Sequence, residues 1–118
     1  MNLDKIFDQA EEGYLIQCRD DDGVIDLFSK SSYGDTLLHV AVGLHDFDAV
    51  EYLVKQGLDI NARGECMITP LCSAAMSRDV EMIGLLLSLG ADMSITNCLN
   101  QLPAEVFFES LQKHGPNK

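Results

Sequence analysis

Basic residues and long apolar runs are both scarce in this chain of 118 residues. Eight Lys and Arg residues stand against 19 Asp and Glu residues, which gives a formal net charge of −11. A surface this negative repels phosphate groups, so nucleic acids and anionic membranes are disfavoured as partners. The charge-matched partner is a basic protein. With 47% apolar and 23% charged residues, the composition is that of a single folded globular domain.

The sequence also lacks segments that would direct it to a membrane or out of the cell. No apolar run approaches the roughly 18 residues of a membrane span. The first residues, MNLDKIFD, lack the basic start and apolar stretch of a signal peptide. We therefore expect a cytoplasmic protein, and in that reducing compartment the four cysteines are expected to be thiols rather than disulfides. They are Cys18, Cys66, Cys72 and Cys98.

Motifs for catalysis, metal binding and cofactor binding are missing as well. The cysteines form no C-x-x-C pair and no zinc-type spacing with histidine. No glycine-rich phosphate loop or nucleophile motif occurs. The acidic run 20–22 is similar to the start of a calcium loop, but Ser31 stands where an EF-hand requires Glu, so we interpret the run as a solvated turn. We expect no enzyme activity and no catalytic, cofactor or metal residues.

What the chain does contain is an internal repeat with a fixed period. Residues 33–63 laid over residues 66–96 give seven identities in 31 positions. Each identity falls where one structural unit needs that residue, which argues against chance. The pairs are Thr36/Thr69, Leu38/Leu71, Ala41/Ala74, Asp46/Asp79, Leu53/Leu86, Gly57/Gly90 and Asp59/Asp92.

The second copy predicts two helices joined by a tight turn. Thr69 and Pro70 are typical of a helix N-cap and first helical position. After the polar turn 77–79, Asp79 is placed to cap a second helix, which Gly90 ends in a left-handed conformation. That helix carries one apolar face at helical spacing, made of Val80, Ile83, Leu86 and Leu87.

These motifs resemble those of ankyrin-repeat proteins. Residues 34–41 (GDTLLHVA) resemble the signature G-x-T-P-L-H-x-A, and residues 57–62 (GLDINA) resemble the G-A-D-V-N-A segment. Residues 69–74 and 90–94 match in the second copy. The resemblance implies an all-α solenoid of stacked helix-turn-helix units with short hairpin-like connectors. It also implies one domain over 1–118: an N-terminal capping repeat (1–30), repeats 31–63 and 64–96, a partial repeat (97–114) and a tail (115–118).

The flanks are similar to degenerate terminal repeats. Residues 6–13 resemble the first helix and turn of a repeat, and residues 15–18 are expected to begin a shortened second helix. Residues 24–28 are apolar enough to pack and are compatible with a strand or a short helix. Residues 97–104 resemble the opening of a third repeat, with a helix expected from Pro103 to Lys113 and no second helix after it.

The histidine positions are interpreted through the resemblance. His39 lies at the signature position, where the family's histidine bonds neighbouring backbone and ties one repeat to the next. Cys72 takes the same place in the second copy and is expected to be a small core residue. His45 falls at the helix–helix turn, where an exposed side chain could contact a partner.

The resemblance also nominates a partner-binding surface, because hairpin tips and first helices line a concave face in this family. Exposed apolar residues beside carboxylates on that face would suit a cationic partner. Any one of these residues could instead be ordinary surface, and Ile68 and Met76 could pack against an adjacent repeat. The nominated residues are Glu11, Glu12, Ser32, Tyr33, Asp35, Leu44, His45, Glu65, Cys66, Ile68, Met76, Ser77, Leu99 and Gln101.

Two functions are compatible with these features. The first is a monomeric, non-catalytic module that binds and inhibits a basic protein, as immunity proteins neutralise toxin nucleases, because carboxylates can mimic the phosphates that such a toxin's cleft attracts. The second is a regulatory or scaffold protein that binds a cellular protein through a concave apolar patch. Affinity that falls steeply with salt favours the first, and a flat profile favours the second.

Overall fold

The computed structural model describes residues 3–113. The expected tail at 115–118, His114 and the first two residues lie outside this range. The helices are α1 (Leu3–Gly13), α2 (Leu37–Gly43), α3 (Phe47–Lys55), α4 (Pro70–Met76), α5 (Val80–Ser88) and α6 (Pro103–Lys113), with a 3-10 turn η1 (Glu65–Met67). Over the described residues the β-structure consists of two isolated bridges, Arg19–Ile25 and Lys30–Thr36.

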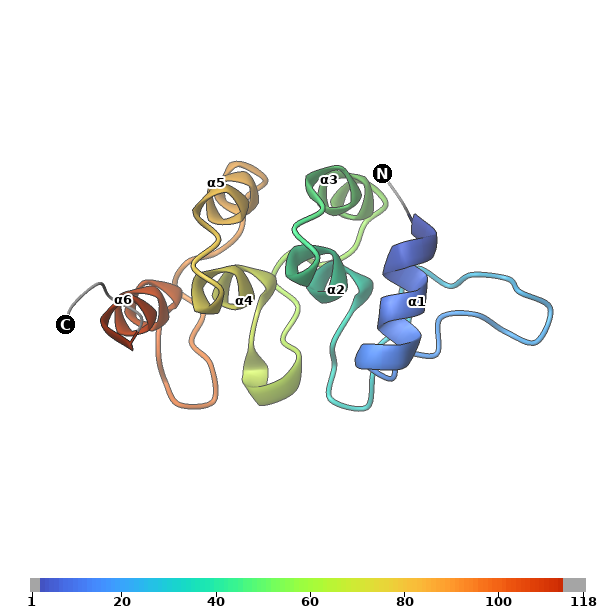
Figure 1. Ribbon diagram of the computed structural model, residues 1–118, viewed down its shortest axis with the longest axis horizontal. Helices are drawn as coiled ribbons and strands as arrows, with labels where there is room; N and C mark the ends of the chain where they lie inside the picture. Colours follow the sequence, from blue (N-terminus) through green and yellow to red (C-terminus); the bar gives the residue numbers. More distant parts are fainter. Residues whose placement is uncertain (1–2, 114–118) are drawn as a thin grey trace.

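The helices repeat with the period found in the sequence. Helices α2, α4 and α6 begin at Leu37, Pro70 and Pro103, which are equally spaced along the chain, and α3 and α5 are related by the same spacing. Figure 1 shows α2, α4 and α6 side by side in one row, with α3 and α5 in a second row and the connecting tips on the opposite side of the first row. The expected all-α solenoid is confirmed, including the C-terminal helix at Pro103–Lys113.

Side chains at the N-cap positions start these helices where the sequence predicts. The Thr36 hydroxyl accepts from the backbone N–H groups of Leu38 and His39 at the start of α2, and Thr69 accepts from the N–H of Cys72 at the start of α4. Asp46 and Asp79 cap α3 and α5 in the same manner. These short helices depend on such caps because each has few internal hydrogen bonds.

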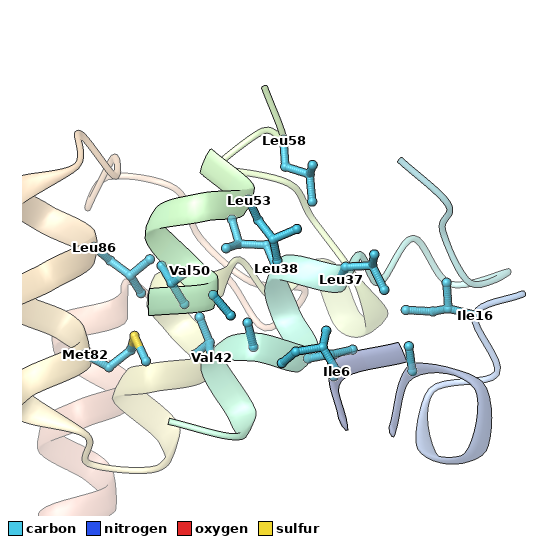
Figure 2. Close-up of a cluster of buried hydrophobic side chains, with 14 of the residues drawn as sticks. Ile6, Ile16, Leu37, Leu38, Val42, Val50, Leu53, Leu58, Met82 and Leu86 are labelled. Atoms are coloured by element: carbon cyan, nitrogen blue, oxygen red, sulfur yellow. The ribbon is translucent and has the colours of Figure 1, made fainter. Parts of the chain in front are cut away.

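One buried cluster runs from α1 to α5, and a second, smaller one of Cys72, Ala75 and Val106 joins α6 to α4. Figure 2 shows Ile6 of α1, Leu38 and Val42 of α2, Val50 and Leu53 of α3, and Met82 and Leu86 of α5 in the larger cluster. In both clusters the apolar side chains of one repeat are covered by its neighbour, as expected for stacked units.

Three hairpin tips are closed by the same backbone hydrogen bond. The N–H groups of Ser31, Gly64 and Asn97 donate to the carbonyl oxygens of Asp35, Ile68 and Gln101, at 2.9, 2.9 and 3.0 Å. Donors and acceptors recur at the spacing of the helices, so the connector is repeated as faithfully as the helices are.

The N-terminal connection, residues 14–36 between α1 and α2, differs from the sequence prediction. The shortened second helix expected at residues 15–18 is wrong, because Tyr14 and the residues after it leave the helical conformation and Leu15 has φ of 56°. Residues 24–28 form neither a strand nor a helix; Ile25 makes one bridge to Arg19. The acidic run is a solvated turn, in which the Asp20 carboxylate accepts from the N–H groups of Asp22 and Val24.

The prediction that all four cysteines are thiols is wrong for two of them. Cys66 and Cys98 form a disulfide between neighbouring hairpin tips, with Cα atoms 5.0 Å apart, and the Cys98 N–H also donates to the Cys66 carbonyl at 2.9 Å. They are 32 residues apart in the chain, so no local pattern marks them as partners. Cys18 and Cys72 are free and buried, and burial raises the pKa of both thiols.

The residues of the predicted apolar face of α5 differ in burial. Leu86 is fully buried, together with Met82, because these side chains face the preceding repeat. Val80 and Leu87 are exposed and Ile83 is half-buried, because they face the other end of the array. The sequence pattern identifies an apolar helix but does not tell which side has a neighbour.

Candidate protein-binding surface

A groove runs along the concave side of the array, between the hairpin tips and the first helices. It consists of two adjoining hollows, each of about 320 Å³, that share Ile68 and Met76. We call these two hollows together the concave groove. Its residues come from the end of α1, from the three tips and from α2, α4 and α6, so its shape depends on how the repeats stack.

The floor between the first two tips is held by a buried polar network. The N–H of Thr36 donates to His39 Nδ1 at 3.0 Å, which leaves the proton on Nε2, and Nε2 donates to the Ile68 carbonyl at 2.8 Å. The Asp35 carboxylate accepts from the N–H of Glu65 at 3.1 Å. His39 therefore ties one repeat to the next, as the resemblance implied. Burial lowers the pKa of His39, which favours the neutral ring.

The next pair of tips is joined differently. Cys72 occupies the place of His39 one repeat later and carries no equivalent ring. There the Cys66–Cys98 disulfide and the hydrogen bond between the same two residues connect the tips. The concave groove is thus held by a histidine network at one end and by a covalent bond at the other.

The walls of the concave groove present large apolar side chains to solvent. Tyr33 is 67% exposed, Met76 49% and Leu99 72%, and Ile68 is half-buried between them. Flat or flexible side chains of this kind are enriched where proteins bind one another. Gly64 on the floor has no room for a side chain, since a Cβ there would collide with the Asp35 carboxylate.

Carboxylates accompany these apolar side chains. Glu65 lines the first hollow and Glu109 the second, and both are exposed. Lys113, at the far end of the second hollow, lies 4.0 Å from Glu109 and balances part of that charge. Tyr14 lies at the other end, where burial and the nearby Asp35 charge raise the pKa of its phenol. The groove is therefore apolar with an acidic rim.

The structure brings nine of the fourteen nominated residues into the concave groove. Two of them have structural roles that the sequence did not show: Asp35 is buried, with its carboxylate hydrogen-bonded to the next tip, and Cys66 is in the disulfide rather than a free thiol. The nine are Ser32, Tyr33, Asp35, Glu65, Cys66, Ile68, Met76, Leu99 and Gln101.

The other five nominated residues lie elsewhere. Glu11 is half-buried in an ion pair with Arg19 at 2.8 Å, and Glu12 is exposed on α1 outside the two hollows. Leu44 and His45 line a separate hollow beside the turn between α2 and α3. Ser77 is exposed in the turn between α4 and α5.

Several groove residues were missed by sequence reasoning. Gly13, Tyr14 and Leu15 line the first hollow because α1 continues to Gly13 and the chain turns directly after it, beside the first tip. Asn97 closes the third tip and lines the second hollow. Asn97 aligns with Gly64 at the repeat spacing, and this alignment was a signal that could have identified it.

A separate polar cluster connects the two repeats on the outer side. His45 Nδ1 lies 2.6 Å from Asp79 Oδ2, and His45 Nε2 lies 3.7 Å from Glu81 Oε1. The hydrogen bond to Asp79 raises the pKa of His45. Among residues 3–113, these three side chains form a group whose ligand atoms lie within 4.8 Å of one another. Because Asp79 also caps α5, the geometry is that of an ion pair between repeats.

Comparison with known proteins decides the family. The family model described as ankyrin repeats (3 copies) matches residues 14–97. The chain belongs to the ankyrin-repeat family. Ankyrin repeats are protein–protein interaction modules, in general without catalytic activity, and this ankyrin-repeat chain is such a module. In the described part of the chain, no helix has both the length and the apolar character needed to cross a membrane.

Individual relatives share the repeat region with this ankyrin-repeat protein. Human protein phosphatase 1 regulatory subunit 27 is 38% identical over 73 residues, which are 62% of this chain and 47% of the relative. A putative ankyrin repeat protein of Rickettsia felis is 31% identical over 74 residues, 63% of this chain and 28% of the relative. A putative ankyrin repeat protein of fowlpox virus is 37% identical over 59 residues, which are 50% of this chain and 42% of the relative. The chain spans less than half the length of these relatives.

Proposed function

We propose that the concave groove binds a basic segment of a partner protein and blocks it. The observation that carries this proposal is the combination of exposed Tyr33, Met76 and Leu99 with an acidic rim, on a chain with a net charge of −11. Apolar side chains supply most of the binding free energy at such surfaces, and the carboxylates raise the association rate and select a cationic partner.

Inhibition of a toxin nuclease is the specific form of this function that the charge favours. A nuclease attracts phosphates into a cleft lined with Lys and Arg. The carboxylates of Glu65 and Glu109 carry negative charge, as phosphates do, on a preformed surface. The rim of the concave groove can therefore bind such a cleft in place of a nucleic acid. On this proposal the protein acts as a monomer in the cytoplasm, with one groove per chain.

Regulation of a cellular protein is the second candidate. One relative is named as a regulatory subunit of protein phosphatase 1, and it shares the repeat region with this chain. In that case the partner contacts the apolar walls of the concave groove, and the acidic rim contributes little to the affinity.

The test begins with capture of the partner from cells that contain this protein, using the tagged full chain as bait. The affinity of the identified partner is then measured by calorimetry between low and high salt. Binding that weakens steeply with salt supports the masking of a basic surface, since exposed charges more than about 10 Å apart are screened at 0.1 M salt. A flat profile supports the regulatory candidate instead.

Matched variants show whether the concave groove is the surface used. Tyr33→Ala and Glu65→Lys are expected to weaken binding by about tenfold or more while the fold is retained. Phe28→Ala and Glu51→Lys change exposed residues outside the groove and serve as controls. If the controls weaken binding as much as the groove variants, the groove is not the binding site.

The nuclease form of the proposal has its own readout. If the partner cleaves labelled RNA or DNA, one equivalent of this chain is expected to stop cleavage, and Glu65→Lys is expected to restore it in part. A partner that remains active in the saturated complex would exclude blockade by the acidic rim.

A further inference from the structure

A second apolar groove lies at the C-terminal end of the array, away from the tips. It has a volume of about 260 Å³ and lies between α4, α5 and α6. Its lining includes Val80, Ile83, Leu87, Met93, Pro103 and Phe107. We call it the end groove. None of these six side chains lines the concave groove.

The repeat shows what covers the equivalent surface elsewhere in the molecule. One period earlier, Phe47, Val50, Val54 and Ile60 occupy the places of Val80, Ile83, Leu87 and Met93. Val50 is buried in the cluster that contains Met82 and Leu86 of the following repeat, and the other three are half-buried because they pack against that cluster.

Within residues 3–113, the end groove has no such cover. Val80 is 63% exposed and Met93 60%, whereas their equivalents one repeat earlier are half-buried. Helix α6 packs on α4, as α4 packs on α2, but within residues 3–113 no helix follows α6 to lie on α5. The end groove is therefore the site that a helix occupies at the preceding repeat interface.

Two exposed carboxylates are next to lining residues of the end groove in the sequence. Asp92 precedes Met93 and Glu105 follows Ala104, whereas the Glu81 carboxylate lies 3.7 Å from His45 of the preceding repeat. A second copy of this chain stacked on the same end would place like carboxylates opposite one another, which disfavours self-association. A cationic helix is the complementary occupant.

We propose that the end groove binds an amphipathic helix of a partner protein, in the position that α5 takes against the preceding repeat. The helix presents two large apolar side chains four residues apart, as Met82 and Leu86 do, because that spacing places both on one helical face. Lys or Arg residues flank this face and lie near Asp92 and Glu105. This surface is separate from the concave groove, so both can be occupied at once.

A synthetic peptide provides the probe. A fluorescein-labelled helical 15-residue peptide carries the Met82 and Leu86 face of α5 and lysines at its other exposed positions. A second peptide replaces those lysines with glutamates. In an anisotropy titration with the full chain, the lysine peptide is expected to bind saturably and the glutamate peptide at least about tenfold more weakly.

One pair of variants identifies the surface. Val80→Lys is expected to weaken peptide binding about tenfold or more, while Val24→Lys is expected to leave it unchanged. Val24 is a matched control, because it is 62% exposed and belongs to the segment after α1. Figure 1 shows that segment at the end of the array opposite to α6. Unchanged far-UV circular dichroism shows that both variants fold.

Several results would overturn the proposal: no saturable binding, equal binding of the two peptides, or equal loss in the two valine variants. Sedimentation provides a further test. If the wild-type chain is a dimer and Val80→Lys dissociates it, the occupant of the end groove is a second copy of this chain and the proposal is wrong. Tyr33→Ala is expected to leave peptide binding intact, so failure here is distinguishable from failure of the concave groove.

Discussion

Replacing His39 with Leu removes the hydrogen bonds that His39 makes between the first two repeats, and it fills the space of the imidazole ring with an apolar side chain. The buried Thr36 N–H loses its acceptor on Nδ1, and the Ile68 carbonyl loses the proton on Nε2. An unsatisfied buried backbone group costs about 1–3 kcal/mol. The Ile68 carbonyl still accepts from the Gly64 N–H, so the Thr36 N–H is the group left without a partner and the predicted loss is about 1–3 kcal/mol. The free energy of unfolding of a small domain is about 5–15 kcal/mol, so a loss of this size is a substantial part of the stability.

The assay is urea unfolding followed by far-UV circular dichroism, since the chain has no Trp for fluorescence. The midpoint is expected to fall while the slope of free energy against urea stays unchanged, because the surface exposed on unfolding is nearly the same. His45→Asn is the control: it removes a histidine from the surface at a left-handed position that Asn tolerates. Equal midpoints for the two variants would refute the reasoning that the His39 network holds the repeats together.

The remaining predictions concern the core, the disulfide and the two described histidines. Leu86→Ala is expected to lower the free energy of unfolding by about 2–5 kcal/mol through a buried cavity, measured by the same urea titration. Cys66→Ser breaks the bond to Cys98 and is expected to cost about 2–4 kcal/mol, with the mutant insensitive to reductant and the wild type sensitive. Between pH 5.5 and 8, stability is expected to peak near the ordinary histidine pKa of 6.5. His39 has a lowered pKa, so its contribution is lost as the pH falls below about 6.5; His45 has a raised pKa, so its contribution is lost as the pH rises through that raised value. His45→Asn is expected to abolish only the decline on the alkaline side, which unfolding at each pH checks.

Much of the fold could be predicted because the repeat specifies each helix locally. Thr36 and Thr69 cap the first helices, Asp46 and Asp79 cap the second ones, and Gly57 and Gly90 follow them with positive φ. Each of these residues acts within a few positions of itself along the chain. A single sequence carries such information directly, and a second copy at a fixed spacing reinforces it.

The N-terminal connection could not be predicted in the same way. Residues 14–36 contain no second copy of the pattern, and the apolar residues at 15–18 fit a helix as well as an extended segment. The chain instead turns at Leu15 and buries Ile16 and Cys18 against the first repeat. That choice depends on the surface that α1 and α2 present, which is a tertiary property.

The candidate site was predicted in part for a similar reason. Tyr33, Ile68 and Leu99 were nominated because the ankyrin resemblance implies that hairpin tips and first helices line a concave face. Exposure was harder to predict than position: Asp35 turns inward to receive the Glu65 N–H, and Glu11 is paired with Arg19. Each of these partners comes from a different part of the chain.

By itself, the amino-acid sequence determined the period, the helix caps, the order of the helices and the acidic character of the surface. These depend on interactions between residues near one another in the chain and on composition. Only the tertiary structure decided that Cys66 bonds to Cys98, that His39 reaches Ile68, and that one side of α5 is buried while the other forms the end groove. The physical reason is that these outcomes depend on how neighbouring repeats are placed, because a side chain's partners across a stack are set by packing rather than by distance along the chain.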